Sequence, residues 1–64
     1  MTLNEALTDC LREAGVRIEP GSCLWVMEKD LHDVWIYMEN MDGEITSHRF
    51  DWNTLQYKIV MKKD

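Results

Sequence analysis

The chain has 64 residues, of which 12 are acidic and 7 are basic, and its formal net charge is −5. This length allows one domain, which we place over residues 1–64. The excess of carboxylates argues against binding to nucleic-acid phosphates or to an anionic membrane surface, because both require clustered Lys and Arg. Hydrophobic residues make up 45% of the chain and include three Trp, which is the composition of a folded protein.

The first predicted element is an amphipathic helix over residues 3–14. Thr2 and Glu5 have the spacing of a capping box at a helix N-terminus. Apolar residues then recur at helical spacing and form one stripe: Leu3, Ala6, Leu7, Cys10, Leu11 and Ala14. Gly15 follows where a left-handed C-cap residue belongs. We expect the stripe to be buried against a sheet.

Three segments, separated by turn signals, are predicted to be strands: residues 23–28, 34–39 and 44–50. The first is apolar, the second is rich in β-branched and aromatic residues, and the third alternates moderately between apolar and polar residues. Asp42-Gly43, between the second and third segments, is a strong hairpin signal. A two-residue turn at this position would place Tyr37 opposite His48. The chain is therefore expected to form a meander of antiparallel strands.

Residues 55–61 are predicted to form a fourth strand. Leu55, Tyr57, Ile59 and Met61 alternate with three other residues, which matches the two-residue period of a strand. The predicted fold class is α+β: one N-terminal helix packed on a four-stranded, or alternatively three-stranded, antiparallel β-meander. The expected element order is α-β-β-β-β.

One face of this sheet is expected to remain uncovered, because a single short helix can cover only the other. Monomers seldom expose contiguous apolar patches larger than a few hundred Å². We therefore expect an interface there, with a second copy of the chain or with another protein. The expected apolar interface residues are Trp25, Trp35, Ile36, Tyr37 and Met38. The sequence leaves open which face the helix covers.

The outer face of the predicted helix is acidic. Glu5, Asp9 and Glu13 lie opposite the apolar stripe at successive helical turns. One interpretation is a solvated helix surface, and the other is an acidic ridge that occupies a basic groove of a nucleic-acid-binding protein. Acidic residues in or beside the hairpin turns would extend this partner-binding surface: Asp30, Asp33, Glu39, Asp42 and Glu44. Reversing Asp9 and Glu13 to Lys is then expected to abolish partner binding and to preserve the fold.

The chain shows no recognisable motif for catalysis, and we expect no catalytic residue, cofactor or metal. It has no Gly-rich phosphate loop and no His-Glu-x-x-His sequence. Cys10 and Cys23 are expected to be free thiols, because they do not form a C-x-x-C pair. The sequence contains no apolar run of the ~20 residues that a membrane span needs. We expect no signal peptide, because Glu5 and Asp9 fall where such a peptide needs a basic region and an apolar run. The expected location is cytoplasmic.

These observations lead to two functional hypotheses. The first is a small acidic, non-enzymatic protein-binding module, a stoichiometric inhibitor that occupies a basic site of a nucleic-acid-handling protein. Small phage-encoded inhibitors of host defence, anti-CRISPR proteins included, share this size and charge, and the analogy extends no further. The second is a homodimeric structural or regulatory accessory protein that pairs through its apolar sheet face. Neither hypothesis involves direct contact with nucleic acid or a membrane.

Overall fold

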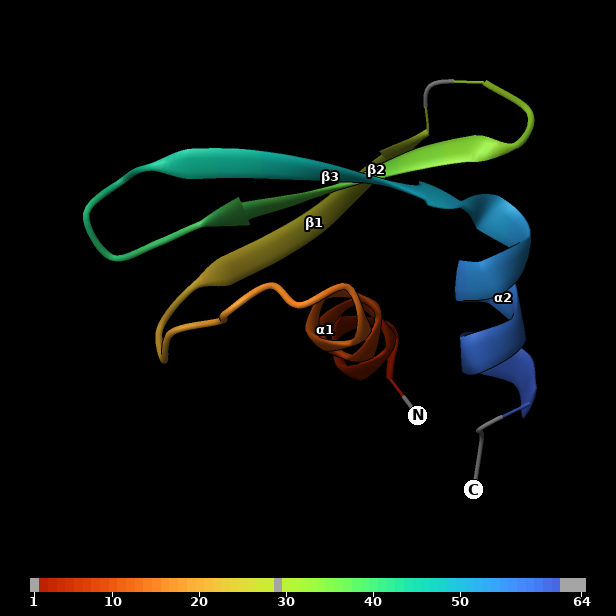
Figure 1. The fold of residues 1–64 in the computed structure, drawn as a ribbon, viewed down its shortest axis with the longest axis horizontal. Helices are drawn as coiled ribbons and strands as arrows, with labels where there is room; N and C mark the ends of the chain where they lie inside the picture. The colour runs from red at the N-terminus through yellow and green to blue at the C-terminus, as the bar shows by residue number, and fades with distance from the viewer. Residues whose placement is uncertain (1, 29, 62–64) are drawn as a thin grey trace.

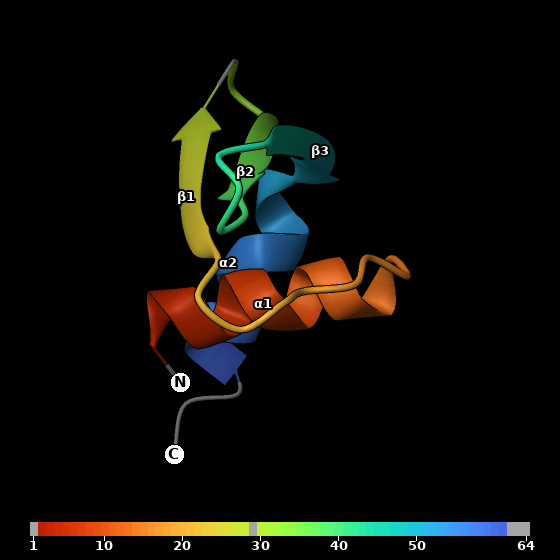
Figure 2. The ribbon, with the colours of Figure 1, turned by 90° about the vertical axis from the view of Figure 1, so that its left-hand side faces the viewer.

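The computed structural model describes residues 2–28 and 30–61. Its elements in chain order are α1 (Leu3–Glu13), β1 (Cys23–Glu28), β2 (Asp33–Glu39), β3 (Ile45–Asp51) and α2 (Trp52–Met61). The strands form an antiparallel sheet in the order β1-β2-β3. Figure 1 shows both helices on the same side of this sheet, and the turned view of Figure 2 shows α1 crossing α2. The α+β class is confirmed.

Helix α1 has the caps that the sequence predicts. The Thr2 hydroxyl accepts the Glu5 N–H at 3.2 Å, and the Glu5 carboxylate accepts the Thr2 N–H at 3.2 Å. At the other end, Gly15 has a φ of +83°, and the N–H of Val16 donates to the Leu11 carbonyl at 2.9 Å. This left-handed glycine and backward hydrogen bond form a Schellman motif. The helix ends one residue earlier than predicted.

The predicted fourth strand is wrong, because residues 52–61 form helix α2. Trp52, Leu55 and Ile59 are spaced i, i+3 and i+7 and share one helix face. Leu55 and Ile59, which alternate as in a strand, therefore fit a helix as well. Leu55 is fully buried, and Trp52 and Ile59 pack against the core. The Trp52 N–H donates to the His32 carbonyl at 2.7 Å, which fixes the start of α2 beside the β1–β2 loop. In the described part of the chain the sheet therefore has three strands.

The β2–β3 hairpin has a three-residue loop instead of the predicted two-residue turn. The Asn40 N–H donates to the Glu44 carbonyl, and the Gly43 N–H donates to the Asn40 carbonyl, both at 3.0 Å. The Asn40 side-chain oxygen also accepts the N–H groups of Asp42 and Glu44, at 3.0 and 2.9 Å. Gly43 takes the left-handed conformation, with a φ of +84°, that such a loop requires at its last position.

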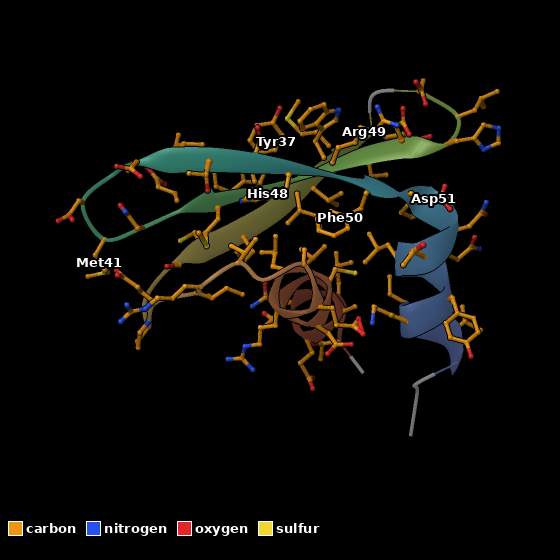
Figure 3. All side chains as sticks on the ribbon, viewed as in Figure 1. Tyr37, Met41, His48, Arg49, Phe50 and Asp51 are labelled. Atoms are coloured by element: carbon orange, nitrogen blue, oxygen red, sulfur yellow. The ribbon has the colours of Figure 1, made fainter. Side chains whose placement is uncertain are left out.

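The longer loop shifts the register by one residue, and a shift of one residue moves side chains to the opposite face of a sheet. Tyr37 pairs with Ser47 instead of with His48. Figure 3 shows the result: Tyr37 and Arg49 lie on the side away from the helices, whereas His48 and Phe50 lie on the helix side.

The core lies between the helices and the sheet face that they cover. Its buried apolar residues are Ala6, Leu7, Cys10, Leu11, Val34, Ile36 and Leu55. Ile36 was expected at an exposed interface, but it is 0% exposed because the helices cover the even-numbered positions of β2. Met38 lies on the same face as Ile36 by strand alternation. These two residues therefore do not belong to the uncovered face.

Candidate functional site

Strand alternation places a group of large apolar side chains on the sheet face that carries Tyr37, which is turned away from both helices (Figure 3). We call this group the aromatic face, and it consists of Trp25, Met27, Trp35, Tyr37 and Ile45. Trp25 and Tyr37 are directly opposite each other on β1 and β2, and their rings stack with centroids 5.6 Å apart and planes 6° apart. Trp35 lies opposite both Met27 and Arg49 on the flanking strands.

The aromatic face is accessible to a partner. Met27 and Ile45 are 49% and 54% exposed, and the three aromatic residues are partly exposed. Neither helix lies over this side of the sheet (Figures 1 and 3). An uncovered apolar face is therefore present, on a set of residues that overlaps the predicted interface at Trp25, Trp35 and Tyr37.

Acidic residues lie at both ends of the aromatic face. Asp33 and Asp51 are directly opposite each other where β2 begins and β3 ends. Glu39 lies at the other end, where it pairs with Ile45. Among the described residues of this face, Arg49 is the one basic side chain, and its Nε lies 3.5 Å from Asp33 Oδ1. Three carboxylates and one guanidinium leave the face with an excess of negative charge.

The remaining predicted acids of the sheet lie in its loops. Asp30 Oδ1 accepts the N–H groups of His32 and Asp33, at 3.0 and 2.9 Å. These hydrogen bonds hold the pKa of Asp30 below its ordinary value, so the carboxylate stays charged and shapes the loop before β2. Asp42 and Glu44 are exposed in the β2–β3 loop. They are next to the Glu39 end of the sheet and add to its negative charge.

The acidic residues of α1 are largely engaged within the fold. Lys58 of α2 places its Nζ 2.8 Å from Asp9 Oδ2 and in contact with Glu13 Oε2. Lys58 is only 6% exposed. Its hydrogen bonds to Asp9 and then to Glu13 raise the pKa of the lysine, and they outweigh the opposite effect of burial. Glu5 closes the capping box, and its hydrogen bonds to Thr2 lower its pKa.

This lysine changes the interpretation of the predicted ridge. Asp9 and Glu13 neutralise a buried cation, so they are less available to a partner than free surface carboxylates. Reversing both to Lys would place three cations together between the helices. That variant therefore cannot separate a loss of binding from a loss of structure. The contact could not be predicted from the sequence pattern, which placed Lys58 in a strand, whereas the structure places it in helix α2.

Other parts of the surface offer little for small-molecule chemistry. A hollow of about 240 Å³ between α1, β3 and α2 is lined by Cys10, Glu13, Ala14, Phe50, Thr54 and Lys58. It is smaller than the ~300–1,000 Å³ usual for ligand pockets. Among the residues that the structure describes, no group of three His, Cys, Asp or Glu side chains could hold a metal ion.

Several residues of the uncovered face were missed by the sequence analysis: Met27, Ile45, Arg49 and Asp51. Alternation along β1 already places Met27 beside Trp25, so that residue could have been found. The residues from β3 depend on the register of the hairpin. That register follows from the side-chain hydrogen bonds of Asn40, which a two-residue turn would not use.

The chain matches no protein-family model, and neither a curated protein nor a solved structure matches it. Neither helix in the described part of the chain has the length and apolar character needed to cross a membrane.

Proposed function

We propose that this protein is a small non-enzymatic protein-binding module that docks through its aromatic face. The observation that carries this proposal is the grouping of Trp25, Trp35 and Tyr37 on the sheet face that neither helix covers. Aromatic residues and Met are enriched in the centres of protein interfaces. Covering them with a partner removes apolar surface from water, which drives association.

The charge at the ends of the aromatic face favours a partner with a basic surface. Asp33 and Asp51 lie at one end and Glu39 at the other, and the whole chain carries a net charge of −5. Such a distribution accelerates encounter with a positively charged surface and disfavours acidic ones. Proteins that bind nucleic acids present basic surfaces of this kind. We propose them as the target class, with this chain as a stoichiometric inhibitor that occupies the basic site.

The aromatic face also supports a second candidate, a homodimeric accessory protein. Two copies would bury the face against itself in an isologous interface. Each copy carries a net charge of −5, so added salt should strengthen this pairing by screening the repulsion. Added salt should weaken the binding of a basic partner. The sign of the salt dependence therefore separates the two candidates.

The test is an affinity capture from a nuclease-treated lysate of the source organism, with three forms of the tagged protein. These are the unmodified chain, the variant Trp35→Thr, and the control variant Tyr57→Gln, which alters an exposed aromatic residue on α2 instead. We expect a nucleic-acid-binding protein to bind to the unmodified chain and to the control, to be released by moderate salt, and to be lost with Trp35→Thr. Equal capture by Trp35→Thr, with its circular dichroism spectrum unchanged, would contradict the proposal.

A further inference from the structure

The Asp33 end of the aromatic face has an arrangement that is unfavourable in the isolated chain. Asp33 and Asp51 are directly opposite each other on β2 and β3, and like charges at opposed positions of a sheet repel. Arg49 offsets this only in part. Its contact with Asp33 is a single one at 3.5 Å, and its side chain is 65% exposed, so it behaves as a weak surface ion pair. A further cation at this end would relieve the repulsion.

An aromatic residue, Trp35, shares this face of the sheet with the two carboxylates and pairs with Arg49 on β3. Trp35 is two residues along β2 from Asp33, on the same face of the sheet, and it is partly exposed. Tryptophan is the side chain whose ring face attracts cations most strongly. An aromatic ring on the same face as two carboxylates matches the guanidinium of arginine, which stacks on aromatic rings and donates several hydrogen bonds in one plane. A lysine ammonium can neutralise the carboxylates but cannot stack on the ring.

We propose that the aromatic face recognises an arginine side chain of its protein partner, stacked on Trp35 and hydrogen-bonded to Asp33 and Asp51. This inference rests on the proposed function, because it assumes that the partner docks on the aromatic face. It identifies the partner by chemistry: a protein surface that presents arginine beside apolar residues. The apolar residues would cover Trp25, Tyr37 and Met27, and the arginine would fix the orientation.

Two other occupants fit less well. Nucleic-acid bases also stack on exposed aromatic residues, but their phosphates would meet the carboxylates at both ends of the face. A second copy of the chain would offer Arg49 as its one cation on the described residues of this face, together with three more carboxylates. Charge complementarity therefore favours a cationic protein over both.

The test uses short peptides in which valine alternates with arginine, lysine or the neutral arginine analogue citrulline. Each is titrated into the full chain, and binding is followed by the NMR signals of the Trp indole N–H groups. The arginine peptide should shift the Trp35 signal and bind about tenfold more tightly than the citrulline peptide, with the lysine peptide between them.

A matched pair of variants tests the carboxylates. The double variant Asp33→Asn with Asp51→Asn should weaken binding of the arginine peptide about tenfold. The control, Asp42→Asn with Glu44→Gln, removes the same charge from the exposed β2–β3 loop and should change the affinity by less than about twofold. Equal losses in the two double variants would overturn the proposal, because long-range charge would then explain the binding.

The outcomes also separate this inference from the proposed function. If the citrulline and arginine peptides bind equally while Trp35→Thr still abolishes capture of the partner, the proposal of arginine recognition is wrong. The proposal that the partner docks on the aromatic face is then retained. If Trp35→Thr captures the partner normally, both are wrong. If a single-stranded oligonucleotide shifts the Trp35 signal more strongly than the arginine peptide, the protein partner is replaced by a nucleic acid and the inference fails.

Discussion

Lys58 extends from α2 into the space beside α1, where Asp9 and Glu13 accept its hydrogen bonds. A buried ammonium group would be costly without such partners, because its hydration is lost. Conversely, the lysine removes the repulsion between two carboxylates one helical turn apart. This three-residue cluster holds the two helices together at the side of the core.

Replacing Lys58 with Ala should lower the free energy of unfolding by roughly 1–2 kcal/mol, since both carboxylates lose their cation. The loss is smaller than for a fully buried pair, because the side chains of Asp9 and Glu13 are 33% and 57% exposed. Lys58→Met keeps the apolar stem and should recover part of the loss. Urea denaturation measures the stability of the unmodified chain and of the two variants. An unchanged midpoint for Lys58→Ala would show that the cluster does not contribute to stability.

The same cluster predicts a pH dependence on the alkaline side. The pKa of Lys58 is raised above its ordinary value of 10.5 in the folded protein. The stabilisation is therefore fully present below pH 10.5 and is lost as the pH rises through the higher folded-state pKa. The difference in stability between the unmodified chain and Lys58→Met should stay constant from neutral pH to about pH 10 and shrink above it. Thermal unfolding at a series of pH values measures this difference, and a decrease that begins near neutral pH would contradict it.

Asn40 stabilises the three-residue loop between β2 and β3 by accepting two backbone hydrogen bonds. The length of this loop determines which residues of β3 face away from the helices. Replacing Asn40 with Ala removes two accepted hydrogen bonds and should lower the free energy of unfolding by about 1 kcal/mol. Asn40→Asp keeps an acceptor oxygen in the same place and should be closer to the unmodified chain. Denaturation midpoints provide the comparison, and equal losses in the two variants would exclude a role for the side-chain oxygen.

At the scale of elements, the shape of the core and of the uncovered sheet face depends on whether residues 52–61 form a helix or a strand. As a helix, this segment covers the side of the core beside β3 and supplies Leu55. As the predicted fourth strand it would instead have extended the sheet and enlarged the uncovered face. Gln56 is exposed on α2, so its contribution to stability comes mainly from backbone propensity.

Gln56 therefore provides a direct test of this element. In a helix, Gln56→Ala should be more stable than Gln56→Val by about 0.5 kcal/mol, because Ala is the best helix former and Val loses rotamer freedom. In a strand, the order would be reversed. Chemical denaturation of the two variants distinguishes these orders, and greater stability of the Val variant would contradict the helix.

At the scale of the whole molecule, both helices lie on one side of the sheet, and acidic residues lie at both ends of the other face. We expect the isolated chain to remain monomeric at low ionic strength, because copies with a charge of −5 repel each other. Light scattering across a range of protein concentrations measures the molar mass. A mass that rises with concentration at low salt, and falls in Trp35→Thr, would favour the homodimeric candidate.

Local signals were sufficient for the parts of the fold that depend on neighbouring residues. Thr2, Glu5 and Gly15 define α1 through short-range hydrogen bonds and backbone preference, and residues 23–28 form the predicted first strand. An uncovered apolar face was also expected from the sequence, because one predicted helix could cover only one face of the sheet. The structure has such a face, although it contains two helices on the other side. Of the predicted interface residues, Trp25, Trp35 and Tyr37 lie on this face, and their role in binding stays a prediction.

Tertiary structure decided the type of the last element, the contact between the helices and the face on which each strand residue lies. The pattern of Leu55 and Ile59 fits a strand and a helix equally well, and only packing against the core selects the helix. The partnership of Lys58 with Asp9 joins residues far apart in the chain, so no local pattern contains it. The face on which Ile36, Arg49 and Asp51 lie depends on strand register and on which side the helices pack. Local preferences are set by neighbours in the chain, whereas these features depend on contacts that exist only after the chain has folded.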